Sequence, residues 1–214
     1  MWIFGTIKAK IRKSVCVIME KNLSNERKKE IAEIANDIRK KYNLVSPNFD
    51  LIKFLKEYEG FEILLTEFDD ETTGVIMVDD NRKLLTDGPN KIILINKDYE
   101  KDLEYFKKRR FICAHEYGHY ILHKKGSVEF AMRDTRIKDT LEEKEAEYFA
   151  YCLLMPETTV RSICDNSKKE INELLSFNET TLSSIFSDIF NVSIKKASVR
   201  LSELGIGDIN ESKS

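Results

Sequence analysis

The chain has 214 residues, and its 35 Lys and Arg nearly balance its 37 Asp and Glu, which leaves a formal net charge of −2. This balance argues against a strongly basic nucleic-acid-binding protein and against an acidic disordered tail. Apolar residues make up 42% of the sequence and only three prolines occur, so a packed core is expected rather than a low-complexity chain.

The N-terminal segment, residues 1–24, is predicted to be an extension, floppy or partly helical. Its apolar residues are interrupted by basic ones between Lys8 and Lys13, whereas a signal peptide has its charges first and an unbroken apolar run after them. A helix lying on a membrane surface is the alternative for this segment. No stretch approaches 18 uninterrupted apolar residues, so no membrane-spanning segment is expected.

The cysteines favour an intracellular protein. They form no Cys-x-x-Cys pair and lack the spacing of a secreted disulfide scaffold. The four are Cys16, Cys113, Cys152 and Cys164. We interpret them as reduced thiols, which predicts a cytoplasmic location.

The first half of the chain predicts two helices followed by three short strands. Apolar residues recur at helical spacing over residues 25–42 and again over 50–58. Three β-rich runs follow at 61–65, 74–78 and 91–95, with Asp, Asn and Gly between them. Strands this close in sequence predict a small antiparallel meander.

From about residue 102 onward the pattern is helical, and no further strand is predicted. Helical periodicity covers residues 103–123, 141–154, 180–190 and 195–204. The order of helices, strands and helices predicts an α+β fold with a small, mainly antiparallel sheet.

Histidine is rare, and its distribution indicates a metal site. Only three occur, His115, His119 and His123, all within nine positions. The first two belong to a His-Glu-x-x-His motif. Residues four apart on a helix project from one face, so both imidazoles can reach one metal ion. Glu116, beside the first histidine, can then remove a proton from a water that the metal activates. The motif therefore predicts a zinc site with Glu116 as the catalytic base.

Two further residues are informative, Gly118 inside the motif and His123 after it. Gly118 costs a helix about 1 kcal/mol relative to alanine, which indicates that another element approaches closely there. His123 continues the four-residue spacing, but it lies about 12 Å from His115 along a helix axis. Zinc–nitrogen bonds of about 2.1 Å cannot span that distance. We therefore interpret His123 as structural or as lying near the site entrance.

The third metal ligand is expected from the predicted helix over residues 141–154, which carries four glutamates. Small and apolar residues define a face of this helix that can pack closely on the motif helix: Ala146, Ala150, Leu153 and Leu154. Glu143 lies at the edge of that face and is the predicted ligand, whereas Glu145 is expected to point to solvent. Glu147, one turn further on, is predicted to accept the N–H of a ligating histidine.

These residues resemble two blocks of the ImmA/IrrE-type metallopeptidases, a family of gluzincin-like zinc proteases. The first block, Arg-Phe-x-x-Ala-His-Glu-x-Gly-His-x-x-x-His, is matched at residues 110–123. The second, Glu-x-x-Ala-Asn-x-Phe-Ala-x-x-Leu-Leu-Met-Pro, is matched at 143–156, except that Glu147 occupies the usual Asn position. A weaker likeness extends over residues 28–206.

Together with the predicted elements, the resemblance divides the chain into four parts. Residues 25–165 would form a zincin-like metallopeptidase domain after the N-terminal extension. Residues 166–206 would form a helical C-terminal subdomain, and 207–214 a flexible tail.

The resemblance implies a zinc-dependent endopeptidase that acts on a protein substrate. In such proteins the substrate is typically a helix–turn–helix transcriptional repressor of a mobile element or stress response, cleaved at a specific site. Because the chain has no fourth histidine, the oxyanion of the reaction would be stabilised by Tyr148, Tyr151, Tyr120 or Arg133, if by any side chain.

A non-catalytic regulator that binds a protein partner or DNA, with a structural zinc site, is the alternative. The segment from 180 to 205 resembles a helix–turn–helix, but its basic and acidic residues nearly cancel. A helix that enters a DNA groove needs a basic face, so packing against the peptidase domain or docking the substrate is the favoured role. Peptide deformylase also carries the histidine motif, but its upstream Gly-Cys-Leu segment is absent here.

Overall fold

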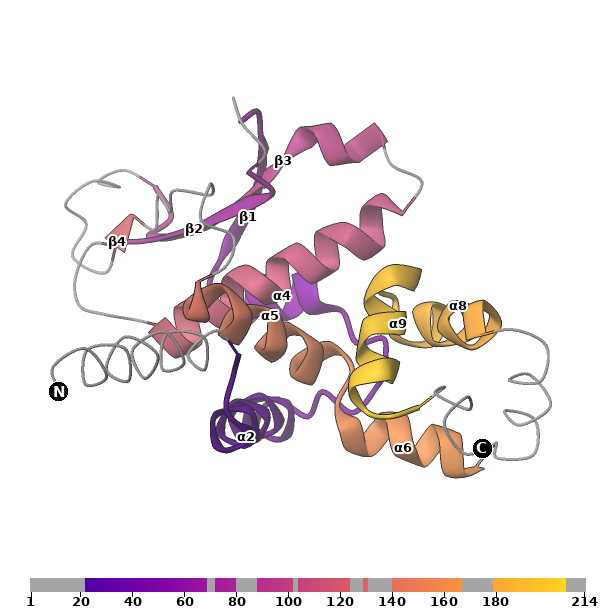
Figure 1. Ribbon diagram of the computed structural model, residues 1–214. Helices are drawn as coiled ribbons and strands as arrows, with labels where there is room; N and C mark the ends of the chain where they lie inside the picture. The colour runs from indigo at the N-terminus through magenta and orange to yellow at the C-terminus, as the bar shows by residue number, and fades with distance from the viewer. Residues whose placement is uncertain are drawn as a thin grey trace, which may run out of the picture.

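The computed structural model describes residues 22–68, 72–79, 88–101, 104–123, 129–130, 140–166 and 179–206 (Figure 1). Its helices are α2 (Asn25–Lys41), α3 (Leu51–Glu57), the 3-10 helix η1 (Lys97–Lys101), α4 (Tyr105–His123), α5 (Leu141–Leu154), α6 (Glu157–Asn166), α8 (Glu179–Phe190) and α9 (Ile194–Glu203). Its strands are β1 (Glu62–Thr66), β2 (Gly74–Val78), β3 (Lys91–Asn96) and β4 (Glu129–Phe130). The predicted extension and tail fall almost wholly outside these segments. No helix within them is both long and apolar enough to cross a bilayer.

Four helices begin at a side chain that accepts a hydrogen bond from the first helical turn. Ser24, Asp50, Thr140 and Ser193 each accept from the backbone N–H three residues further on. Such a cap satisfies one of the amide donors that a helix start leaves unpaired. Thr140 is the cap that bears on function, because it fixes the first turn of α5.

The sheet has the strand order β1-β3-β2-β4. β1 runs parallel to β3, and β2 runs antiparallel to both β3 and β4. The sheet keeps the predicted mainly antiparallel character, but the meander is wrong because β3 lies between β1 and β2. Burial explains the order. Ile92, Ile93 and Ile95 of β3 are all buried, as expected of a central strand covered on both faces, whereas Leu64 and Leu65 of β1 are 45% and 40% exposed.

Three short elements were not predicted: η1, α6 and β4. β4 has only two residues, Glu129 and Phe130, paired with Val78 and Met77, and so short a strand has no periodicity to detect. Helix α6 follows the proline at the end of α5 and has only ten residues, with Val160 fully buried and Ile163 and Cys164 packed against the core.

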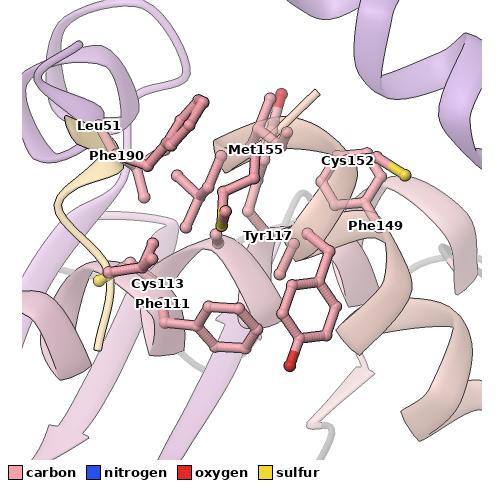
Figure 2. Close-up of a cluster of buried hydrophobic side chains, with 14 of the residues drawn as sticks. Leu51, Phe111, Cys113, Tyr117, Phe149, Cys152, Met155 and Phe190 are labelled. Carbon is pink, nitrogen blue, oxygen red and sulfur yellow. The ribbon is translucent and has the colours of Figure 1, made fainter. Parts of the chain in front are cut away.

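Helix α4 lies between the sheet and α5, and α2 packs on another face of α5 (Figure 1). Side chains from these layers form one buried cluster, in which the rings of Tyr117 and Phe149 meet edge to face with centroids 5.9 Å apart (Figure 2). The predicted face of α5 is confirmed, since its four residues are all 0% exposed: Ala146, Ala150, Leu153 and Leu154.

Gly118 lies at a close contact between α4 and α5. A Cβ atom at this position would lie 2.9 Å from Phe149 Cδ1 and 3.1 Å from the Ala146 carbonyl oxygen. Both distances are shorter than ordinary van der Waals contact. The glycine therefore lets the two helices approach, as the sequence predicted.

The C-terminal helices pack on the same core. Their buried apolar residues belong to the cluster formed by α4 and α5: Leu182, Phe186, Phe190, Ala197 and Leu201. Arg200 of α9 is 1% exposed, and its Nε donates to the Met155 carbonyl oxygen at 3.2 Å. This agrees with the prediction that the C-terminal segment packs against the peptidase domain.

We expect Gly118→Ala to destabilise the fold even though alanine is the better helix former. Alanine gains about 1 kcal/mol in helix propensity, but its Cβ would lie only 2.9 Å from Phe149 Cδ1, so we expect an overpacking cost in the upper part of the usual range of about 1–3 kcal/mol. The free energy of unfolding, measured by urea denaturation, should therefore fall by about 1–2 kcal/mol. Gly88→Ala is the control, because a Cβ at Gly88 meets no atom within 4 Å. Equal stability of the two variants would contradict the close contact.

Candidate metal centre

His115 and His119 project from one face of α4, one turn apart. Their Nε2 atoms lie 3.0 Å from each other. The side chain of His119 is 3% exposed and that of His115 is 19% exposed, so the pair is open to solvent on the His115 side. The helix predicted from the motif thus brings both imidazoles to one point, as expected.

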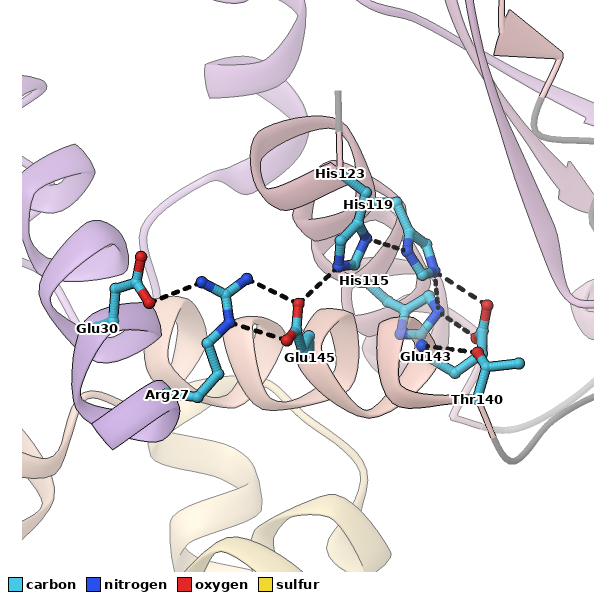
Figure 3. Close-up of polar contacts among 8 residues, drawn as sticks. All are labelled: Arg27, Glu30, His115, His119, His123, Thr140, Glu143 and Glu145. Carbon is cyan, nitrogen blue, oxygen red and sulfur yellow. Dashed lines mark hydrogen bonds and ion pairs between the residues drawn. The ribbon is translucent and has the colours of Figure 1, made fainter. Parts of the chain in front are cut away.

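Glu143 of α5 completes the group. Its Oε2 lies 3.1 Å from His115 Nε2, and its Oε1 lies 3.3 Å from His119 Nε2 (Figure 3). The Thr140 hydroxyl accepts the backbone N–H of Glu143 at 3.2 Å, which fixes the helical turn that carries the carboxylate. The structure therefore brings together the three predicted residues, and they can hold a metal ion.

The spacing of these atoms fits a tetrahedral zinc ion. Bonds of about 2.0–2.1 Å at tetrahedral angles separate neighbouring ligand atoms by about 3.3 Å. The two Nε2 atoms lie 3.0 Å apart, and the two oxygens of Glu143 lie 3.1 Å from His115 Nε2 and 3.3 Å from His119 Nε2. Two imidazoles and one carboxylate leave the fourth position open, which is the donor set of catalytic rather than structural zinc sites.

Glu116 is buried between α4 and β2, with 6% of its surface exposed. Gly74 of β2 lies directly against it, since a Cβ there would come 3.2 Å from Glu116 Oε1 and 2.6 Å from Ile112 Cγ2. A glycine is therefore required for β2 to reach this carboxylate. Sequence reasoning from the motif alone did not identify this contact.

His123 and Glu145 form a second group of polar contacts behind the ligands. His123 Nδ1 lies 3.2 Å from His119 Nδ1, and His123 Nε2 lies 2.8 Å from Glu145 Oε2 (Figure 3). Arg27 of α2 binds the same carboxylate with two N–H groups, at 2.8 and 2.7 Å. The Arg27 hydrogen bond is the largest cause that holds the pKa of Glu145 below its usual value.

The prediction that Glu145 points to solvent is wrong. Its side chain is only 9% exposed, because Arg27 of α2 and His123 of α4 both bind it. The interpretation of His123 as a residue outside the ligand set agrees with the structure, which places it next to the ligand His119.

The remaining predicted residues lie away from the three ligand atoms. Glu147 binds Lys196 of α9 at 2.6 Å rather than a histidine, so the expected bond to a ligand is not formed. Tyr148 faces Lys28, 5.2 Å from its ring centroid, and burial raises its pKa to about 12. Tyr151 packs on Phe111 with centroids 5.1 Å apart.

Arg133 lies outside the residues that the structure describes, so its predicted role in stabilising the oxyanion stays a prediction. Tyr148 and Tyr151 contact α2, α4 and α9 instead, and we assign neither of them such a role.

Comparison with known protein families agrees with this geometry. The family model described as the IrrE N-terminal-like domain, of the M78 peptidases, matches residues 57–202. The chain belongs to this family. The match spans β1 to α9 and includes the histidine motif and Glu143, so the family resemblance of the two sequence blocks is confirmed.

A phage protein is also similar to this chain. It is "Uncharacterized immunity region protein 2" of Bacillus phage phi105, which is 35% identical over 74 residues. The matched stretch covers 35% of this chain and 44% of the phage protein, less than half the length of that relative.

The arrangement predicts that the protein binds one Zn²⁺ per chain. Glu143→Gln removes the anionic ligand, so the loss of zinc affinity should exceed the ~10–100-fold that follows from losing an outer hydrogen-bond partner. Competition with a chromophoric chelator measures this affinity. Glu147→Gln makes the same chemical change four residues further along α5 and should bind zinc as the natural protein does. Equal affinity in both variants would contradict the assigned ligand.

Proposed function

We propose that this protein is a zinc-dependent endopeptidase that cleaves a helix–turn–helix transcriptional repressor at a specific site and so relieves repression. The observation that carries the proposal is the meeting of His115 Nε2 and His119 Nε2, 3.0 Å apart, with the Glu143 carboxylate, whose two oxygens lie 3.1 Å from His115 Nε2 and 3.3 Å from His119 Nε2. The open side of this group and the neighbouring Glu116 are the parts that hydrolysis of a peptide bond requires.

In this proposal His115, His119 and Glu143 would hold a zinc ion, which when bound would supply the Lewis acid that polarises the scissile carbonyl and lowers the pKa of water toward about 7. Glu116 acts as the general base and accepts the proton of the attacking water at its carboxylate. As the carbon–nitrogen bond breaks, the same carboxylate delivers that proton to the leaving amine. Its burial against β2 holds it in one position for both transfers.

The repressor as substrate is supported by family membership and by the phage relative. The name of that relative refers to an immunity region, and such a region fits a protein that controls repression of a mobile element. We place the reaction in the cytoplasm, where such repressors act. Three cysteines of the described segments are free, in keeping with a reducing compartment: Cys113, Cys152 and Cys164.

The competing proposal is a regulator that binds DNA or a protein with a structural zinc site. DNA binding through α9 has little support, because two of its three basic side chains bind within the protein. Lys196 binds Glu147 and Arg200 binds Glu203, each through an ion pair of 2.6–2.7 Å.

We expect Glu116→Gln to retain zinc and to lose cleavage by about 10²–10⁴-fold, the usual contribution of a general base. The reading frames next to this one are searched for a small helix–turn–helix protein as the candidate substrate. The assay mixes that protein with the purified peptidase, with and without chelator, and follows cleavage by mass spectrometry. Glu147→Gln is the control and should cleave at the natural rate. If derepression in cells survives Glu116→Gln, the regulator that acts by binding is the correct function.

An extended substrate can reach Glu116 by adding a strand to β2. The N–H of Asn96 donates to the Thr73 carbonyl oxygen, so by antiparallel alternation the backbone groups of Gly74 and Ile76 point away from β3. Within the described residues, β4 pairs only with the far end of β2, at Met77 and Val78. A peptide that bonded to Gly74 and Ile76 would pass directly beside Glu116.

Amide hydrogen exchange tests this binding mode. Adding the repressor to the inactive Glu116→Gln protein should slow exchange of the Gly74 and Ile76 amides, because both become hydrogen-bonded to the bound strand. The β1 amides, at the opposite end of the sheet, provide the internal control. Protection confined to β1 would show that the substrate binds the other edge.

A further inference from the structure

The polar contacts behind His119 extend across three helices. His119 Nδ1 meets His123 on α4, His123 meets Glu145 on α5, and Glu145 meets Arg27 on α2 (Figure 3). Arg27 also binds Glu30 at 2.8 Å. We refer to His123, Glu145 and Arg27 as the His123 network. Its three side chains are 10%, 9% and 29% exposed, so it lies mostly under the surface.

The contacts allow one assignment of protons if His119 binds a metal through Nε2. The neutral imidazole then carries its proton on Nδ1 and donates it to His123 Nδ1, 3.2 Å away. His123 must therefore carry its own proton on Nε2, which donates to Glu145 Oε2 at 2.8 Å. Glu145 accepts from this imidazole and from both N–H groups of Arg27.

This arrangement differs from a simple salt bridge between helices. A salt bridge between Arg27 and Glu145 alone would join α2 to α5 without touching the metal site. Here the carboxylate also binds His123, and His123 binds the nitrogen of His119 that faces away from Glu143. Hydrogen bonds to the second nitrogen of a ligating histidine fix its tautomer and ring orientation.

Resting on the proposed zinc site, we propose that the His123 network positions His119, so that Arg27 of α2 helps to set the metal-binding geometry. Arg27 lies 30 residues before the family-matched segment of 57–202, so a helix outside that segment completes the site. The carboxylate of Glu145, paired with the positive charge of Arg27, accepts the hydrogen bond from His123. Two N–H groups of Arg27 hold this carboxylate in one orientation. His123, Glu145 and Arg27 act through His119 and touch no reacting atom.

Glu145→Gln tests the network without changing side-chain volume. The neutral amide accepts a weaker hydrogen bond from His123 and turns an N–H toward Arg27. We expect zinc affinity to fall by about 10–100-fold. The visible absorption bands of the Co²⁺-substituted protein should also change, because they report ligand geometry. Glu147→Gln is the matched control on the same helix, since its ion pair with Lys196 is equally short but lies outside the network.

Two further comparisons distinguish a network that positions His119 from one that only stabilises the fold. Arg27→Gln, at a partly exposed site, should lower zinc affinity in the same direction and serves if Glu145→Gln does not fold. His123→Leu should weaken zinc binding more than His123→Gln, whose amide keeps one acceptor and one donor. Urea unfolding of the zinc-free proteins is measured alongside, because a purely structural ion pair would lower stability and leave zinc affinity unchanged.

Natural zinc affinity and an unchanged cobalt spectrum in Glu145→Gln or in the substitute Arg27→Gln would overturn the inference, whatever the loss of stability. If the natural protein binds neither Zn²⁺ nor Co²⁺, the proposed function and the network both fail. If it binds zinc and cleaves the repressor while both network variants bind zinc normally, the network alone fails.

Discussion

The distance between α4 and α5 is the constraint on which the metal centre depends. Two of the proposed ligands come from α4 and the third from α5, so their atoms meet only where the two helices pack directly against each other. Gly118 provides that closeness, because its missing side chain leaves room for Phe149 and the Ala146 backbone. The stability that this glycine costs its own helix is thereby offset by the burial of a continuous apolar face between the two helices. Packing energy and site geometry are set by the same contact.

Helix α5 is surrounded by other elements, and each of its faces contacts a different helix. One face packs on α4 and presents Glu143, and the groove toward α2 receives Glu145. A third face meets α9 through Glu147 and Lys196. Three glutamates spaced by two residues therefore have three different partners. The helix that covers each glutamate determines its partner. The C-terminal helix α9 covers the face of α5 that carries Glu147.

The parts of the site that depend on local spacing could be predicted from the sequence. His115, Glu116 and His119 follow from the motif on a helix, and Glu143 follows from the small residues that mark the packed face of α5. Glu145 and Glu147 were predicted incorrectly, because their surroundings are supplied by α2 and α9, which are distant in sequence. Periodicity shows which residues share a face, but it does not show which helix will cover that face.

The same limit applies to the sheet. The three main strands were located to within one residue at each end, yet their spatial order was not, because pairing between β1 and β3 skips a strand. The fully apolar run of β3 was the available signal, since a strand buried on both faces belongs in the middle of a sheet. The close approach of Gly74 to Glu116 follows from that order and from the packing of α4 on the sheet.

Arg27 shows that the segment matched by the family model differs from the set of helices that contact the proposed metal site. A protein shortened to residues 57–202 would keep all three proposed ligands and the proposed base, and it would still be recognised as a family member. It would lack Arg27, whose guanidinium holds Glu145 beneath His123. The unit that similarity detects is thus smaller than the set of helices proposed to shape the metal site.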